Sequence, residues 1–258
     1  MIYPIYIPSK NRPDAKFLEL IKDLDADKYL ILEPQDIDKY DNYKDYFTIL
    51  DLKKNDMGLA FSRDFCKTYA DNNNSKWYWL IDDDITKFYK TLNNKNVPIT
   101  PKEALESAQE QFSVMPIALG SLEYQQYSWS QKKPFKLNSY ADCVVCFNLE
   151  RTKKYKYDLQ FKLKQDRDMA LQIMSDNQYV MRALKISFSC PSYGSNKGGL
   201  HEVYHKQKLE KTMAERLVKK WGKKYVNLQV KEHSSGTRYD AKINWKAFKV
   251  DIDWGGVV

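Results

Sequence analysis

The sequence predicts an α/β protein, with a mostly parallel central sheet flanked by helices in a single domain. Short apolar runs alternate with segments of helical length along the first third of the chain, as in βαβ units. The run Trp77–Ile81 contains only bulky residues, which is typical of a strand buried on both faces of a parallel sheet. The 258 residues, 43% of them hydrophobic, suffice for one large domain with a sizeable core.

The first half of the chain supplies the clearest elements. Strands are predicted at Ile2–Ile7, Tyr29–Leu32, Phe47–Leu50 and Trp77–Ile81, and helices at Phe17–Ile21 and Leu59–Ala70. Polar loops follow the first and third strands, at Pro8–Asp14 and Lys53–Gly58. Residues Lys87–Pro101 are expected to form a polar connection before the next helix.

The second half alternates in the same way. We expect helices at Pro101–Phe112, Asp166–Met174 and Lys206–Trp221, and strands at Ile117–Tyr124, Ala141–Leu149, Phe188–Pro191 and Tyr225–Val230. The loop Tyr124–Trp129 is rich in aromatic and amide side chains. Such a loop suits stacking against a flat or sugar-like group, and packing on the edge of the core explains it equally well.

The composition limits the classes of function. A net charge of +8 and a pI near 9.0 favour polyanionic partners, although solubility alone also explains such a charge. No apolar run is long enough to span a membrane, and the start of the chain lacks a basic signal segment, so we expect no membrane association. Cys143 and Cys146 have CxxC spacing in an apolar run and are expected to be core thiols of a cytoplasmic protein.

Three carboxylates, Asp82, Asp83 and Asp84, directly follow the strand Trp77–Ile81. Ligands of open α/β sheets bind at the carboxyl ends of strands, so these charges stand where a site is expected. A divalent cation relieves the repulsion among three anions, and oxygen ligands suit Mg²⁺ or Mn²⁺. The alternative is a solvated acidic turn after a core strand.

A second metal-type pattern is the HExxH sequence of His201–His205. On a helix it places both imidazoles on one face and Glu202 beside a zinc-bound water, as in a zinc metallohydrolase. The motif directly follows two glycines, however, and no third ligand stands out. Neither GxGxxG after the first strand nor GxxxxGK[ST] occurs, so a Rossmann dinucleotide site and a P-loop are both disfavoured.

Asp166 and Asp168 stand at the start of a predicted helix. An aspartate in such a position commonly caps the helix. A positioned carboxylate is also what a weak hydroxyl nucleophile needs as a general base.

The order of these features resembles the GT-A fold of nucleotide-sugar glycosyltransferases. More narrowly, it resembles the phage and TET-associated glycosyltransferase family, which modifies hydroxymethylated DNA bases. The resemblance covers nearly the whole chain and is most specific in Trp77–Ile85 and Gly194–Tyr204. The sequence Gln165–Asp168 departs from the Glu-Asp pair of many such enzymes, which leaves the identity of the base open.

The resemblance implies a role for each of the polar loops. Asp84 would bind a Mn²⁺ or Mg²⁺ ion on the donor diphosphate, Asp82 or Asp83 would assist the metal or hold the ribose, and His201 or His233 would complete the metal shell. The residues expected to line a nucleotide-sugar, taken to be a UDP-sugar, are Pro8, Ser9, Arg12, Glu33, Asn55, Gly58 and Arg63. Lys197, Gly198 and Gly199 would close over the diphosphate as a lid. Asp166, with Asp168 beside it, would be the catalytic base of an inverting transfer, and a retaining transfer would need no such base.

Within the single domain, residues 1–90 are expected to bind the nucleotide and residues 91–258 the acceptor. The lysine-rich helix and the lid belong to the second part. A basic surface with exposed aromatic residues suits double-stranded DNA from which a modified base is extruded. The alternatives are a protein or glycan acceptor, a merely solvated lysine face, and a nucleic-acid binder without activity. The last would leave the three carboxylates without a role.

Overall fold

The computed structural model describes residues 1–191, 207–233 and 236–248. The strands of its large sheet are β1 (Ile5–Pro8), β2 (Lys28–Leu32), β3 (Thr48–Asp51), β4 (Trp77–Ile81), β5 (Lys87–Leu92), β6 (Lys95–Ile99), β7 (Ile117–Tyr124), β8 (Phe135–Leu137), β9 (Val144–Asn148) and β10 (Tyr179–Ser189). The helices of this part are α1 (Lys16–Ile21), η1 (Pro34–Tyr43), α2 (Leu59–Asn72), α3 (Pro101–Ser113), α4 (Gln125–Ser128), α5 (Leu149–Thr152) and α6 (Gln165–Ser175). They are followed by α8 (Gln207–Trp221), β11 (Val226–His233), β12 (Gly236–Ile243) and η2 (Trp245–Ala247).

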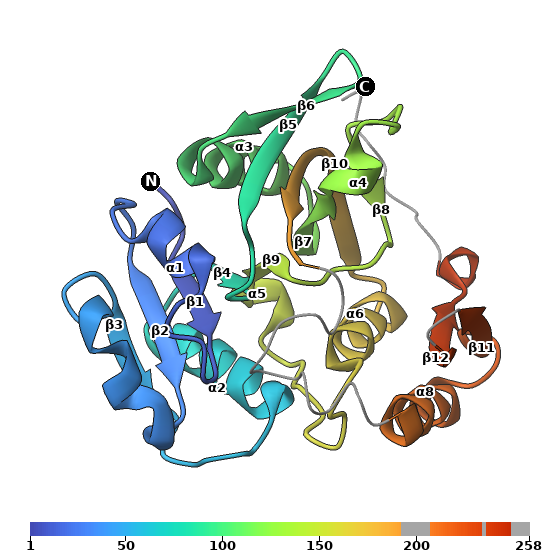
Figure 1. Ribbon diagram of the computed structural model, residues 1–258. Coiled ribbons are helices and arrows are strands. Elements are labelled where there is room, and N and C mark those ends of the chain that lie inside the picture. The colour runs from blue at the N-terminus through green and yellow to red at the C-terminus, as the bar shows by residue number, and fades with distance from the viewer. Residues whose placement is uncertain (192–206, 234–235, 249–258) are drawn as a thin grey trace.

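The predicted α/β architecture is confirmed (Figure 1). The large sheet has the order β3-β2-β1-β4-β9-β7-β10-β5-β6, with β8 paired to β10, and β11 and β12 form a small second sheet beside α8. The nucleotide and acceptor halves were expected to meet at residue 90. This residue lies in β5, which belongs to the same large sheet as β1 to β4. Among the described residues, no helix is both long and apolar enough to cross a membrane.

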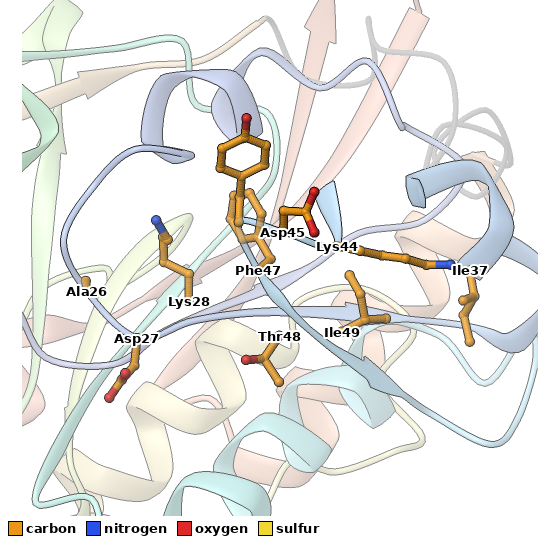
Figure 2. A pocket seen from close by; sticks show the side chains of 10 residues that line it. Ala26, Asp27, Lys28, Ile37, Lys44, Asp45, Phe47, Thr48 and Ile49 are labelled. Atoms are coloured by element: carbon orange, nitrogen blue, oxygen red, sulfur yellow. The ribbon is translucent and has the colours of Figure 1, made fainter. Parts of the chain in front are cut away.

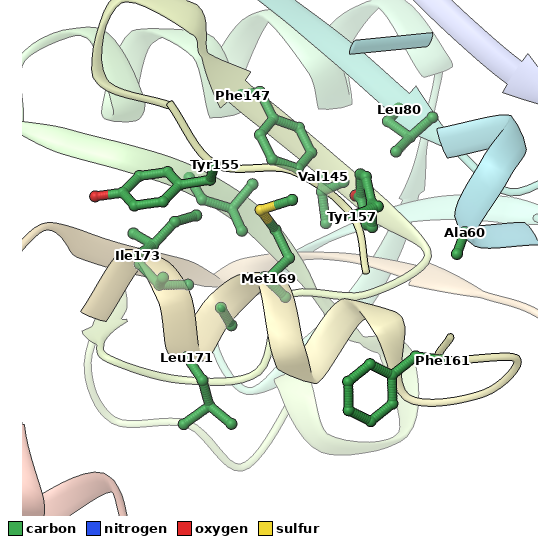
Figure 3. Packing of buried hydrophobic residues seen from close by; sticks show 14 of the residues in the cluster. Ala60, Leu80, Val145, Phe147, Tyr155, Tyr157, Phe161, Met169, Leu171 and Ile173 are labelled. Carbon is green, nitrogen blue, oxygen red and sulfur yellow. The ribbon is translucent and has the colours of Figure 1, made fainter. Parts of the chain in front are cut away.

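Burial on both faces of β4 organises the core. Tyr78 and Leu80 enter one apolar cluster and Trp79 and Ile81 the other, because successive side chains of a strand point to opposite faces. Helices α2 and α6 cover the first face, and α1 and α3 cover the second. Figure 3 shows the first cluster, in which Met169 of α6 packs against side chains of β9.

The sheet is mixed, which corrects the prediction of mostly parallel pairing. Strands β3, β2, β1 and β4 pair in parallel, since helical crossovers connect them, and so do β7 and β10. Strands β9, β5, β6 and β8 pair antiparallel to their neighbours. Parallel pairing therefore dominates the first half of the chain only.

The segment Lys87–Pro101 was predicted to be a connection but contains the hairpin β5–β6. Asn93 and Asn94 at its tip have φ values of 48° and 59°, and two left-handed residues are what a type I′ turn requires. The polar strands hid this hairpin, while the Asn-Asn pair was its sequence signal.

Other boundaries also differ from the predictions. Strand β10 begins at Tyr179, before the predicted Phe188, because its first residues pair with both β7 and β8. Elements η1, α4, α5, β8, β12 and η2 were not predicted, and the remaining predicted strands and helices are confirmed with ends shifted by a few residues.

Candidate active site

The carboxyl ends of β1, β2, β3 and β4 share one edge of the sheet, because these strands are parallel. Strand β9 runs antiparallel to both β4 and β7, so β7 also ends at this edge. The predicted site residues between Pro8, which ends β1, and Asp84 follow these strand ends and meet there.

Asp83 is the centre of a buried hydrogen-bond network. Its Oδ2 accepts a bond from Ser9 Oγ at 2.5 Å, and its Oδ1 accepts one from Arg12 Nη1 at 2.7 Å. The Tyr40 hydroxyl lies 2.8 Å from Ser9 Oγ and accepts a bond from the Arg12 N–H. Burial raises the pKa of Asp83 above its ordinary value, and the Arg12 charge opposes this shift. With only 4% exposure, Asp83 holds the turn after β1 in place.

Asp82 pairs with Arg63 of α2, whose Nη2 donates to Asp82 Oδ1 at 2.6 Å. Burial alone would lower the pKa of Arg63, but the surrounding negative charge, that of Asp82 first, raises it. Arg63 is 5% exposed, and its Nε has no hydrogen-bond partner among the described residues. Arg63 therefore lies beneath the site and orients Asp82.

Asp82 and Asp84 are the accessible carboxylates of the three. Their side chains are 25% and 28% exposed, respectively. Arg12 Nη1 lies 3.9 Å from Asp84 Oδ2, so the same guanidinium that binds Asp83 also faces Asp84. The acidic turn thus has one buried carboxylate, Asp83, and two partly exposed ones that a ligand can reach.

The loops after β1, β2 and β3 are joined by Lys10 and Gln35. Lys10 Nζ lies 2.8 Å from Glu33 Oε2 and 2.5 Å from Asp56 Oδ1. Gln35 donates from Nε2 to Glu33 at 2.7 Å and from its backbone to Asn55 Oδ1 at 3.2 Å. The predicted nucleotide residues Glu33 and Asn55 are therefore brought together by Lys10, which belongs to the predicted polar loop after β1, and by Gln35, which had not been predicted.

Gly58 caps α2 in the left-handed region, with φ of 88°, where any side chain would be strained. Lys162, from the loop before α6, donates from Nζ to the Met57 carbonyl at 3.1 Å. The start of α6 is thereby held near the start of α2.

Asp168 is fully buried in α6 and binds α8. One of its oxygens accepts bonds from Lys220 Nζ and Gln172 Nε2, and the other accepts one from Trp221 Nε1 at 2.9 Å. These contacts attach α8 to α6, so the geometry gives Asp168 a structural role.

Asp166 lies in the first turn of α6 and is partly exposed. The predicted N-cap alternative is not met, because Lys164 occupies that position. The negative charge of Asp166 helps to raise the pKa of both Arg63 and Arg167. Asp166 therefore belongs to the same cluster of charges as Asp82, although 84 residues separate them in the sequence.

Two further residues at this edge, Cys143 and Asp142, were not predicted as site residues. Cys143, predicted to be a core thiol, is partly exposed and has a left-handed φ of 57°, and its carbonyl accepts a bond from the Asp82 N–H at 2.8 Å. Asp142 accepts bonds from Tyr124 at 3.2 Å and from buried Arg182 at 2.7 Å. The sequence signal was an aspartate at the start of an otherwise apolar run.

Several predicted residues lie outside the described part of the chain. These are Lys197, Gly198, Gly199, His201 and His205. His233 ends β11 opposite Gly236, but its side chain is not among those described. The lid, the histidine ligands and the HExxH site therefore remain predictions.

The carboxylates suit a hard cation that a substrate helps to bind. No group of three His, Cys, Asp or Glu side chains within the described ranges is placed to hold a metal ion by itself. Mg²⁺ commonly binds one or two protein carboxylates and completes its shell with phosphate oxygens and water. Asp84 and Asp82 match that donor set, because both are partly exposed.

A hollow of about 510 Å³ lies at the amino ends of β2 and β3, at the edge away from the carboxylates (Figure 2). Lys28, which lines it, donates to the carbonyls of Ile21, Lys22 and Leu24 and so caps the end of α1. Lys44, the other lysine of the lining, pairs with Asp41 at 2.7 Å, so both cations of the hollow already have partners.

Residues 3–194 match the sequence profile of the family described as TET-associated glycosyltransferase. The match includes the carboxylates, the three loops and the start of α6, and it ends before the predicted lid. Most of Gly194–Tyr204, which was expected to be specific for the family, lies beyond it. The comparison with curated proteins gives no match.

Some solved structures are distantly similar. Mannosyl-3-phosphoglycerate synthase from Rubrobacter xylanophilus has 8% identity and a TM-score of 0.47, over 93% of this chain and 85% of that one. Mannose-1-phosphate geranyltransferase from Thermus thermophilus has 11% identity and a TM-score of 0.44, over 73% and 75%. 4-Diphosphocytidyl-2C-methyl-D-erythritol synthase from Anaerococcus prevotii has 9% identity and a TM-score of 0.46, over 72% and 86%. Similarity at this level says nothing about activity, so the family match alone carries the assignment.

Proposed function

We propose, because the chain belongs to the TET-associated glycosyltransferase family, that it transfers a sugar from a UDP-sugar to a hydroxymethylated pyrimidine in double-stranded DNA. The observation that supports this most directly is the difference in burial among the three carboxylates. Asp83 is buried and paired, while Asp82 and Asp84 stay accessible at the carboxyl edge. A solvated acidic turn would not need a buried aspartate that is bound by Ser9 and Arg12 of the loop after β1.

The donor nucleotide would bind over the loops after β1, β2 and β3. Glu33 and Asn55 supply acceptors for ribose or base, and Lys10 keeps the loops together. Arg12 faces the accessible Asp84 and supplies positive charge beside the diphosphate. Arg63 acts from below, through Asp82.

Asp84, assisted by Asp82, would hold a Mg²⁺ or Mn²⁺ ion together with the donor phosphates, and His201 or His233 would complete its shell. When bound, such an ion would neutralise the charge that grows on the leaving diphosphate. The chain adds its own electrostatic stabilisation through Arg12.

Asp166 would be the base of an inverting transfer. Its carboxylate takes the proton of the acceptor hydroxyl while the oxygen forms a bond to the anomeric carbon. The bond from that carbon to the diphosphate breaks, and its electron pair leaves with UDP. Asp168 is not retained for this step, because both of its oxygens already bind other side chains.

The proposal is tested first by calorimetric titration with UDP and GDP, each with and without Mn²⁺. We expect UDP to bind in a metal-dependent way. We then expect one sugar to be added to a hydroxymethylated duplex, which mass spectrometry of the duplex measures. Failure to bind either nucleotide would remove the proposed donor site. Binding of UDP with transfer to protein or glycan, but not to the duplex, would keep the donor site and change the acceptor.

A further inference from the structure

The short helix α4 and its C-cap residue, Trp129, expose two large aromatic side chains. Tyr127 and Trp129 are each 53% exposed, in a protein whose other tryptophans and tyrosines described here mostly lie in or against the core. The Trp129 Nε1 donates to the Gln126 carbonyl at 3.1 Å, which restrains the indole. Exposed, oriented rings of this kind are suited to stacking against a planar ligand.

The charged residues of the segment that follows α4 are all lysines. Lys132, Lys133 and Lys136 are all exposed, and no aspartate or glutamate occurs between residues 124 and 141. None of these three lysines forms an ion pair with the residues that the structure describes. Their positive charge is therefore directed at solvent, next to the aromatic rings.

This region is firmly attached to the sheet. Ser128 Oγ donates to the Leu184 carbonyl of β10 at 2.7 Å and lies 2.6 Å from Thr91 Oγ1 of β5. Asn96 of β6 donates to the Gln125 carbonyl at 2.7 Å. Helix α4 packs against β10, β7 and β5, and β8 pairs with β10 in turn, so both elements rest on the same strand (Figure 1). A rigid support of this kind is what a binding surface needs.

The region is also continuous with the carboxylate edge. The Tyr127 ring lies 6.4 Å from the Tyr124 ring, centre to centre, and Tyr124 donates to Asp142. The next residue, Cys143, accepts the backbone bond of Asp82. A polymer lying on α4 would therefore lead toward the proposed transfer site.

The lysine-rich helix α8 offers less unpaired charge than its sequence suggests. Lys220 binds Asp158 and Asp168, and Arg216 donates to the Gln160 carbonyl. Lys211 lies beside Glu215, and the other exposed lysines include Lys219. Much of this helix's charge thus holds α8 against the loop before α6.

We propose that Tyr127, Trp129, Lys132, Lys133 and Lys136, the α4–β8 surface, form the docking site for nucleic acid. The inference rests on the proposed function and assigns its acceptor to this surface instead of to α8. The lysines contact phosphates, and the rings stack on bases at or beside an extruded nucleotide. Exposed lysines beside exposed rings match the alternation of phosphates and bases along a nucleic acid.

The test is fluorescence anisotropy of a labelled unmodified DNA duplex, and of one of its strands, with the full chain at several salt concentrations. Three double variants are compared: Tyr127→Ala with Trp129→Ala, Lys132→Glu with Lys133→Glu, and, as a control of equal charge change, Lys219→Glu at the end of α8 with Lys223→Glu just after it. We expect both α4–β8 variants to lose roughly tenfold or more in affinity and the control to stay within about twofold. The logarithm of the binding constant falls with the logarithm of the salt concentration, with a slope set by the number of phosphate contacts. In the lysine variant this slope should correspond to about one to two fewer phosphate contacts, while the aromatic variant should keep the wild-type slope.

Wild-type affinity in both α4–β8 variants, or an equal loss in the α8 control, would overturn the inference. UDP binding is measured on the same samples, which separates the two proposals. A wild-type chain that binds UDP but not DNA overturns the docking surface and leaves the donor site standing. A chain that binds DNA through α4 but binds no UDP supports the surface and removes the donor site.

Discussion

Arg63 and Asp82 form a partly buried ion pair, 2.6 Å between Nη2 and Oδ1, that ties helix α2 to the end of β4. The guanidinium is 6% exposed and the carboxylate 25%, so the cation lies on the protein side and the anion on the solvent side. Asp82 can therefore face a ligand while its orientation is fixed from below. This arrangement makes Arg63 a positioning residue.

Replacement of Arg63 by alanine is expected to destabilise the fold and to impair the site together. Removing one partner of such a buried pair costs on the order of 3–5 kcal/mol, less here because Asp82 keeps some contact with water. Arg63→Lys keeps the charge but not the planar geometry and should lose less. Urea denaturation measures both variants. Equal stability of Arg63→Ala and wild type would contradict the pairing.

Asp166 and Asp168 should separate function from stability. Asp166→Asn is expected to lower the rate of sugar transfer by about 10²–10⁴-fold and to leave UDP binding unchanged, because the residue acts only on the acceptor proton. Asp168→Asn should instead lower the melting temperature, since it weakens the bonds to Lys220 and Trp221. Transfer assays and thermal unfolding on both variants check this. A reversed result would make Asp168 the base.

The strand β4 and its carboxylates could be predicted, because a run of bulky residues identifies a buried strand and parallel strands place their ligands at their carboxyl ends. The network around Asp83 could not. Ser9 and Tyr40, which belong to this network, precede Asp83 by 74 and 43 residues in the sequence. Only the strand order β2-β1-β4 brings them together. Spacing within one segment carries no information about such contacts.

The second half was harder to predict for a different reason. Strands β5 and β6 are polar on their exposed sides, so the alternation of apolar and polar residues was weak. Strand β10 pairs with three other strands in different parts of its length, and the sequence does not show these partners. The lysines of α8 could be counted from the sequence, but not their partners. Lys220, one of the lysines of the predicted basic helix, lies 2.9 Å from the buried Asp168.

The pH dependence of stability should report on Asp240, which joins β12 to α6 through Lys164 and Arg167. Burial alone would raise the pKa of Asp240, but the charges of Arg167 and Lys164 lower it to about 2. The folded-state pKa lies below the ordinary value of 3.8, so the ionised group stabilises the fold above about pH 4. Roughly 2 kcal/mol should be lost as the pH falls from about 4 toward 2.

Urea denaturation of wild type and Asp240→Asn across that pH range measures this contribution. The variant should be less stable at neutral pH by a similar amount and should show a flatter pH profile below about pH 4. Parallel profiles for the two proteins would show that Asp240 is not the group responsible.

Gly120 in β7 is expected to tolerate no side chain. A Cβ at Gly120 would lie 2.5 Å from the Phe112 ring of α3, and Gly120 and Phe112 are both buried in the core. Gly120→Ala should therefore cost about 1–3 kcal/mol of unfolding free energy. The double variant Gly120→Ala with Phe112→Leu should recover part of it, because the ring that clashes is removed. No loss in the single variant would mean that α3 and β7 are less closely packed.

Asp84 is the carboxylate whose replacement should separate metal-dependent from metal-independent binding. Its side chain is 28% exposed, and Arg12 Nη1 lies 3.9 Å from its Oδ2. Asp84→Asn keeps the size of the side chain and should lose roughly tenfold or more of the gain in UDP affinity that Mn²⁺ provides. Asp45→Asn makes the same chemical change at the distant hollow and should keep the full gain. Calorimetric titrations with and without Mn²⁺ compare the two variants, and an undiminished gain in Asp84→Asn would assign the metal to other residues.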